Sequence, residues 1–273
     1  MNKTLLVCMI CTGLALMGTA CSPHEEIPEV HESLFSISPL PSPTPAITPS
    51  PTPEPTPSPT PEPLPLSGVV IGLDPGHQAH SNSGQEPVSP GSTTTKKKVS
   101  SGTYGRFTGV AEHEVNLAVG LLLRDMLVDA GATVIMTRET ADVDISNAER
   151  AQLFNKHEVD LGIRLHCNGS DDASIHGAFM LVPTENPYKE DCVRAAELIL
   201  AAYGETTGIS IRKGLTYRSD QTGFNWCDRP VVNIEMGHMT NESDDRKLTD
   251  SEFQPRMAKG IFNGIMDYFE AER

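Results

Sequence analysis

The sequence predicts one α/β domain, built on a mostly parallel, twisted sheet that is flanked by helices. Along residues 68–273, short apolar runs alternate with segments whose apolar residues recur at helical spacing. Strands that alternate with helices in this way usually form a parallel sheet with helices on both faces. A segment of about 200 residues is enough for one such domain.

Each element follows from a local pattern. Short apolar runs predict five strands, at residues 69–73, 132–137, 161–165, 177–182 and 231–234. Apolar residues at helical spacing predict four helices, at residues 116–130, 147–155, 192–203 and 257–269. The polar stretch at residues 78–109 is rich in serine, glycine, threonine and lysine, and it is too long for a simple connection. We expect it to be a flexible rim or a substrate loop.

Residues 1–20 predict a secretory signal peptide. A basic residue at the start is followed by an apolar stretch and then by small residues, which is the order of such a signal. A retained membrane helix is the alternative, although the stretch is slightly short of the about 20 apolar residues that span a bilayer. Ala20-Cys21-Ser22 resembles the end of a bacterial lipoprotein signal, although Gly18 stands where leucine is usual. That resemblance implies an acylated Cys21 and an anchor on the outer face of the cell membrane.

Residues 21–67 are predicted to link this anchor to the folded domain. From residue 39 to residue 65, proline alternates with serine, threonine and glutamate. Proline fixes its own φ angle and lacks an N–H donor, so neither a helix nor a sheet can form there. An extended spacer of ~3.1 Å per residue would reach about 80 Å over this stretch. A semi-rigid stalk suits a substrate that lies away from the membrane; a passive linker is the alternative.

Charge and cysteine content restrict the class of protein. The net charge of −15 argues against a nucleic-acid partner, because such affinity comes mainly from lysine and arginine. Apart from Cys8, Cys11 and Cys21, which belong to the predicted lipoprotein signal, the cysteines are Cys167, Cys192 and Cys227. An odd number at wide spacing is not typical of a disulfide framework. We expect three free thiols, with a single disulfide as the alternative.

Four polar residues stand where the predicted elements begin or end. His77 follows the first strand, His166 ends the third, and Glu235 ends the last. Glu112 opens the first long helix, three residues before Val115, and so lies on its apolar stripe. Ligands of open α/β sheets gather outside the carboxyl ends of the strands. A carboxylate on a buried stripe also needs a partner, so we expect these side chains to meet.

Two imidazoles and one carboxylate at one edge match a catalytic zinc site, with three protein ligands and a fourth position open to water. His77, Glu112 and His166 would be the ligands. Zinc lowers the pKa of its bound water towards ~7, and Glu235 would take the proton as a general base while the water attacks a carbonyl group. The sequence therefore predicts a zinc-dependent hydrolase.

Four sequence blocks resemble the signature of a known family, the zinc-dependent N-acetylmuramoyl-L-alanine amidases that share the amidase-3 catalytic domain. The blocks are residues 73–77 (LDPGH), Glu112 with Asn116-Leu117, residues 165–168 (LHCN), and residues 233–237 (NIEMG) with Thr240-Asn241. Thr137-Arg138 and residues 147–150 also match, so the resemblance covers essentially all of residues 68–273.

The resemblance implies a zinc-peptidase-like fold with a six-stranded sheet. It implies His77, Glu112 and His166 as ligands of Zn²⁺, and Glu235 as the catalytic base that later returns a proton to the leaving amine. The substrate would be peptidoglycan, and the bond cut would be the amide between the lactyl group of N-acetylmuramic acid and L-alanine. We therefore expect an enzyme that acts outside the cytoplasm.

Three further residues are candidates for the cleft. Asn168 follows the second histidine and either lines the cleft or lies outside it. Arg164 departs from the family pattern and either sits at the rim or pairs with an acid. His238 stands where an aromatic residue is common, and either touches the site beside Glu235 or has a structural role.

Two other functions remain open at the level of sequence. One is a zinc peptidase that cuts within the stem peptide. The other is a lipoprotein that binds the cell wall but is catalytically silent.

Overall fold

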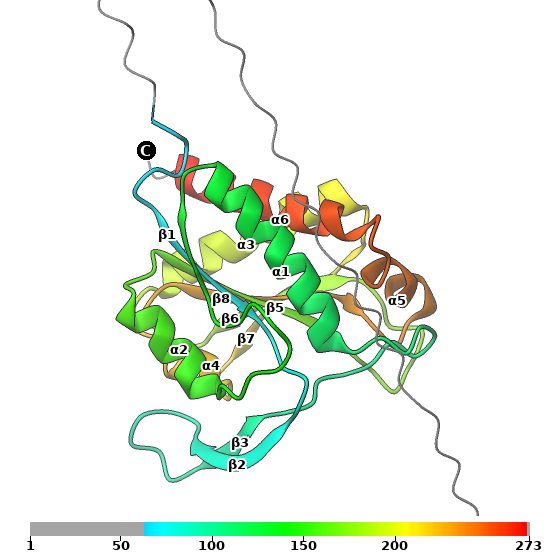
Figure 1. Ribbon diagram of the computed structural model, residues 1–273, viewed down its shortest axis with the longest axis horizontal. Coiled ribbons are helices and arrows are strands. Elements are labelled where there is room, and N and C mark those ends of the chain that lie inside the picture. Colours follow the sequence, from blue (N-terminus) through cyan, green and yellow to red (C-terminus); the bar gives the residue numbers. More distant parts are fainter. Residues whose placement is uncertain (1–62, 272–273) are drawn as a thin grey trace, which may run out of the picture. The chain divides into compact units, whose positions relative to one another are not determined.

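Six strands form the central sheet in the computed structural model, which describes residues 63–271 (Figure 1). In spatial order they are β4 (Thr133–Met136), β1 (Val70–Pro75), β5 (Leu161–Asn168), β8 (Val231–His238), β6 (Ala178–Pro183) and β7 (Ile211–Arg218). The first four run parallel to one another, whereas β6 is antiparallel to β8 and parallel to β7. The predicted α/β fold with a mostly parallel sheet is therefore confirmed. The predicted signal peptide, Cys21 and most of the linker lie outside the described residues.

Helices cover both faces of this sheet (Figure 1). One face carries α1 (Glu112–Asp129), α3 (Lys189–Thr207) and α6 (Gln254–Glu270), and the other carries α2 (Asn147–Lys156) and α4 (Thr222–Asn225). The short α5 (Glu242–Leu248) follows β8. The larger core lies under α1, α3 and α6, where Val119, Ile199 and Ile261 are fully buried against the sheet. Leu66 also packs into this core, just ahead of β1.

The face under α2 is apolar at one end and polar at the other. Phe154 of α2 lies flat on Gly72 and Gly162, where an added Cβ would come within 2.8 Å of the ring. Because side chains alternate along a strand, Asp74 and Arg164 follow these glycines on the same face. This polar end of the face continues to the carboxyl ends of the parallel strands.

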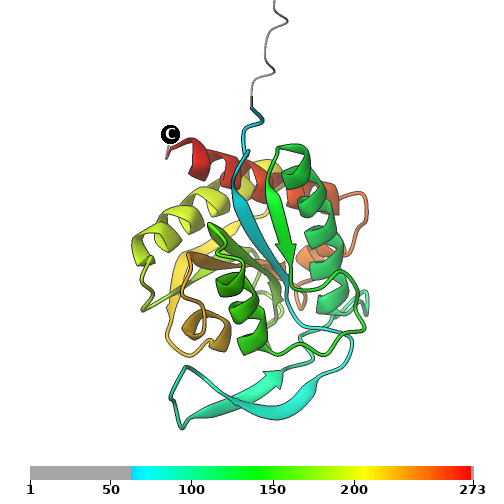
Figure 2. The same cartoon turned by 60° about the vertical axis from the view of Figure 1, so that its left-hand side comes forward.

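The polar stretch at residues 78–109, expected to be a flexible rim or a substrate loop, contains secondary structure that the sequence did not predict. It includes an antiparallel hairpin of β2 (Asn82–Pro87) and β3 (Thr95–Val99). The hairpin lies alongside α2 and α4 (Figure 2) and is held by polar contacts, such as the bond of 2.8 Å from Trp226 Nε1 to the carbonyl of Pro87. Its strands have no alternation of apolar and polar residues, so no strand was predicted there. β7, α4 and α5 also had no apolar run of their own.

Cys167, Cys192 and Cys227 are free thiols and all three are buried. This confirms the expectation of three free thiols in the folded domain. Among residues 63–271, no helix has the length and apolar character needed to cross a membrane.

Candidate active site

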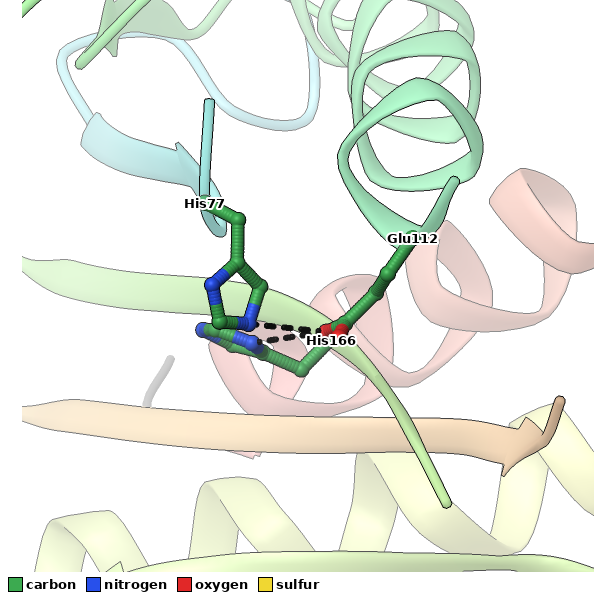
Figure 3. A group of neighbouring side chains, drawn as sticks. All are labelled: His77, Glu112 and His166. Atoms are coloured by element: carbon green, nitrogen blue, oxygen red, sulfur yellow. Dashed lines mark hydrogen bonds and ion pairs between the residues drawn. The ribbon is translucent and has the colours of Figure 1, made fainter. Parts of the chain in front are cut away.

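The side chains of His77, Glu112 and His166 converge at the carboxyl edge of the sheet (Figure 3). One atom from each residue, an imidazole nitrogen or a carboxylate oxygen, lies within 4.8 Å of the others. Glu112 Oε1 is 3.2 Å from His77 Nε2 and 3.1 Å from His166 Nδ1. The three residues come from the loop after β1, the first turn of α1 and the end of β5.

The backbone explains why the two histidines meet. β1 and β5 are parallel neighbours in which Pro75 pairs with Leu165, so the residues that follow them reach the same edge. Gly76 leaves room for the ring of His166, because an added Cβ would lie 2.1 Å from Cε1 of His166. His77 itself adopts a left-handed conformation with φ of 60°, which non-glycine residues rarely do.

Hydrogen bonds fix the orientation of Glu112. Its Oε2 accepts from the backbone N–H of Thr103 at 2.8 Å, and its Oε1 accepts from the backbone N–H of Cys167 at 3.1 Å. Burial alone would raise the pKa of Glu112, but hydrogen bonds and charge from His166 and His77 outweigh burial and lower it. Glu112 is therefore an ionised carboxylate held at a defined position.

The donor set suits a divalent transition-metal ion. Two ligands about 2.1 Å from one tetrahedral ion lie roughly 3.4 Å apart, close to the separations of Glu112 from the two histidines. His77 Nδ1 faces the carbonyl of Ser100 at 3.0 Å. That carbonyl can accept only from Nδ1–H, which leaves the lone pair on Nε2, as in many metal-binding histidines. Burial lowers the pKa of His166 to about 4, so this imidazole is neutral and able to bind a metal.

Glu235 lies directly beside this cluster. It pairs with His166 across β5 and β8, and its Oε1 accepts a hydrogen bond of 3.1 Å from Asn233 Nδ2. Burial and the charge of Glu112 raise the pKa of Glu235 to about 8, against the lowering effects of Asn233, Arg164 and Arg218. A carboxyl group with a pKa near neutrality is suited to proton transfer.

Arg164 lies below the site rather than at its rim. Its Nε donates to Asp74 Oδ2 at 2.8 Å, and its Nη2 donates to Asn147 Oδ1 at 2.8 Å. Both partners of the ion pair are buried. Of the two roles considered for Arg164, the structure supports pairing with an acid.

Asn168 and His238 contact each other at the ends of β5 and β8. His238 Nδ1 is 2.9 Å from the carbonyl of Gly177, so it donates, and Nε2 accepts from Asn168 Nδ2 at 3.2 Å. His238 is only 1% exposed. The environment of His238 therefore agrees with the structural role, in which it orients the amide of Asn168.

Several residues of the site were not predicted. The carbonyl of Ser100 and the N–H of Cys167 act through the backbone, which no side-chain pattern reveals. Arg138 and Arg150 are buried, and both donate to backbone carbonyls in the segment from Pro75 to His77. In the sequence, Arg138 and Arg150 were marked only by lying in segments that match the family pattern, residues 137–138 and 147–150.

Comparison with known proteins agrees with this geometry. A family model described as N-acetylmuramoyl-L-alanine amidase, of the amidase-3 type, matches residues 71–267. The chain belongs to the amidase-3 family. Two curated relatives of the family resemble it over most of their length. A germination-specific N-acetylmuramoyl-L-alanine amidase of Bacillus subtilis is 27% identical, over 75% of this chain and 81% of its own. An N-acetylmuramoyl-L-alanine amidase of Mycobacterium tuberculosis is 26% identical, over 76% of this chain and 89% of its own.

Solved structures share the amidase-3 fold. The N-acetylmuramyl-L-alanine amidase Ami1 from Mycobacterium smegmatis is 26% identical, with a TM-score of 0.69 over 76% of this chain and 99% of Ami1. The apo form of Ami1 from Mycobacterium abscessus is 27% identical, with a TM-score of 0.68 over 74% of this chain and 99% of that one.

Proposed function

We propose that this amidase-3 protein is a zinc-dependent N-acetylmuramoyl-L-alanine amidase, which hydrolyses the amide between N-acetylmuramic acid and L-alanine in peptidoglycan. The convergence of His77, Glu112 and His166 beside Glu235 is the observation that supports it most strongly. The activity named for its relatives supports the choice of bond.

In this proposal, His77, Glu112 and His166 hold the ion and Glu235 transfers the proton. Zinc supplies a Lewis acid that acidifies water and polarises the carbonyl of the scissile amide. Glu235 accepts the proton of the attacking water on a carboxylate oxygen and returns it to the leaving nitrogen of L-alanine. Asn233 orients Glu235 for both steps through its hydrogen bond to Oε1.

The decisive test is the release of new N-terminal L-alanine from purified peptidoglycan. We expect a chelator to abolish release and zinc to restore it. Replacing Glu235 with glutamine preserves shape but removes the base, so we expect the rate to fall by at least ~10²-fold. Glu114→Gln, an exposed change near Glu112 on the same helix, is the matched control. Full activity of the Glu235→Gln variant would contradict the mechanism.

Mass analysis of the products separates the alternatives. A zinc peptidase would release fragments of the stem peptide and leave the amide to N-acetylmuramic acid intact. A silent wall-binding protein would bind zinc and peptidoglycan but give no product with any wall substrate.

The proposed location is the outer face of the cell membrane, through a lipid on Cys21. The signal-like residues 1–20 and the proline-rich stretch support this location. Membranes of cells that express the wild-type chain should retain the protein, whereas the Cys21→Ala variant should appear in the medium. Retention of the Cys21→Ala variant in membranes would favour an uncleaved helix instead.

A further inference from the structure

Two buried arginines converge on the segment that presents His77. Arg138 follows β4 and donates to the carbonyl of Pro75 at 2.7 Å and to that of Gly76 at 3.0 Å. Arg150, on α2, donates to the carbonyl of Pro75 at 3.1 Å and to that of His77 at 3.0 Å. Two guanidinium groups thus bind three consecutive carbonyls of the loop after β1.

This loop needs an external constraint. His77 has a positive φ of 60°, which is unfavourable for a residue with a Cβ atom. Its ring must also meet that of His166 across Gly76, with the ring centroids 4.8 Å apart. The turn has no regular strand or helix pairing at His77 to hold it. The arginine contacts supply the missing hydrogen bonds at the residues where the backbone changes direction.

The arginines are themselves held in place from other elements. Arg138 Nη2 also donates to the carbonyl of His113 in α1 at 2.7 Å, which links the His77 loop to the helix that carries Glu112. Arg150 is 1% exposed and pairs with Asp74 at 2.6 Å. Arg138 and Arg150, which together we call the arginine clamp, therefore connect the loop of His77 to α1, α2 and β1.

We propose that Arg138 and Arg150 are positioning residues for metal binding, which fix His77 in the orientation that completes the site with Glu112 and His166. The inference rests on the proposed function, since it requires that the three residues bind zinc. The hydrogen bonds of both arginines to this segment go to its backbone carbonyls and not to the imidazole of His77. Both act through the backbone of the segment from Pro75 to His77.

An arginine-to-lysine change separates this role from charge pairing in the core. Lysine keeps the positive charge beside Asp74, but it replaces a planar group with five donors by a single ammonium group. The Arg150→Lys variant can therefore keep the ion pair while losing contacts to the loop carbonyls. Arg229 is the matched control, because it also donates to two carbonyls, those of Val159 and Glu158, away from the three clustered residues.

The experiment measures the zinc dissociation constant of the full chain by competition with a chromogenic chelator. The thermal unfolding of the metal-free protein is recorded in parallel. We expect Arg150→Lys to weaken zinc binding by about 10–100-fold, the usual effect of losing an outer contact of a metal ligand. Arg229→Lys should leave zinc binding within about twofold of wild type, because its hydrogen bonds go to the carbonyls of Val159 and Glu158 and not to the His77 loop.

Arg138→Lys provides an independent second variant with the same expected loss of zinc affinity. Unchanged zinc affinity in both folded arginine-to-lysine variants would overturn the proposal. It would also be overturned if neither variant folded without metal, because the arginines would then be needed for the stability of the core. If the wild-type chain binds no zinc, or His77→Ala binds it equally well, the proposed function fails instead. The two failures are therefore distinguishable.

Discussion

Three carboxyl groups on one face of the sheet or at its edge have different proton affinities because their neighbours differ. Asp74 lies between Arg150 and Arg164, and Glu112 lies between two imidazoles, so the pKa of each is lowered despite burial. Glu235 accepts a hydrogen bond from Asn233, and the charge of Glu112 adds to the effect of burial. Carboxyl groups whose environments separate their pKa values in this way often divide the roles of ligand and base.

Removal of the Asn233 amide tests the proposed role of Glu235 as a base. The hydrogen bond from Asn233 stabilises the ionised carboxylate, so Asn233→Ala should raise the pKa of Glu235 further. Because the base must be ionised, kcat/KM falls as pH falls, and the midpoint of this acid limb should move to higher pH. A bond of about 1 kcal/mol corresponds to about 0.7 pH unit. Asn263→Ala, which alters only a contact with Thr206, should leave the profile unchanged; a downward shift for Asn233→Ala would contradict the assignment.

Gly76 offers a steric test of the same site. A methyl group at this position would meet the His166 ring at 2.1 Å, so Gly76→Ala must displace that ring or the loop that leads to His77. We expect zinc affinity and the rate of amide hydrolysis to fall together by ~10²-fold, the order of loss that a misplaced ligand produces. If the Gly76→Ala variant keeps wild-type zinc affinity, measured by chelator competition, the rings of His77 and His166 do not share an ion.

At the scale of the elements, the sequence predicted five of the six strands of the central sheet and missed β7 and the two strands of the hairpin. β1, β5 and β8 have continuous apolar runs because both of their faces are covered. The residues at their ends could therefore be found in the sequence. β2 and β3 consist mainly of polar residues, with Val99 as their buried apolar side chain, and are held by contacts with neighbouring elements. The arginine clamp was missed because a carbonyl that accepts from an arginine leaves no trace in the sequence.

Helix α2 shows how a local sequence signal supports the site from a distance. Its capping box joins Ser146 and Glu149, whose side chains each accept from the other's backbone N–H. Ser146→Ala should cost about 1 kcal/mol of stability and lower Tm by about 2–4 °C. Since Arg150 belongs to this helix, any accompanying loss of zinc affinity should make the drop in stability larger when zinc is bound at saturation. Ser83→Ala, at an exposed position on β2, should leave Tm unchanged; an equal drop in that variant would rule out the cap as the cause.

At the scale of the whole molecule, Asp74 connects the sheet to the elements around the site. Its Oδ1 accepts from Thr137 at 2.7 Å and from Arg150, and its Oδ2 accepts from Arg164. Loop, helix and strand residues thus share one buried carboxylate beneath the candidate active site. Removal of one partner from a buried ion pair leaves an uncompensated charge and typically costs about 3–5 kcal/mol.

This arrangement predicts a specific loss of stability in acid. Burial alone would raise the pKa of Asp74, but the charges of Arg150 and Arg164 outweigh it and hold the pKa well below its ordinary value of 3.8. A carboxyl group with a lowered folded-state pKa contributes stability above the ordinary pKa, and this contribution declines as pH falls further. Urea unfolding of the metal-free protein should therefore show Asp74→Asn to be less stable than wild type by about 3–5 kcal/mol near pH 7. The difference should shrink steadily below about pH 4. Asp171→Asn, at an exposed position, should follow the wild-type curve. A gap for Asp74→Asn that stays constant down to pH 2 would mean that folding does not lower the pKa of Asp74.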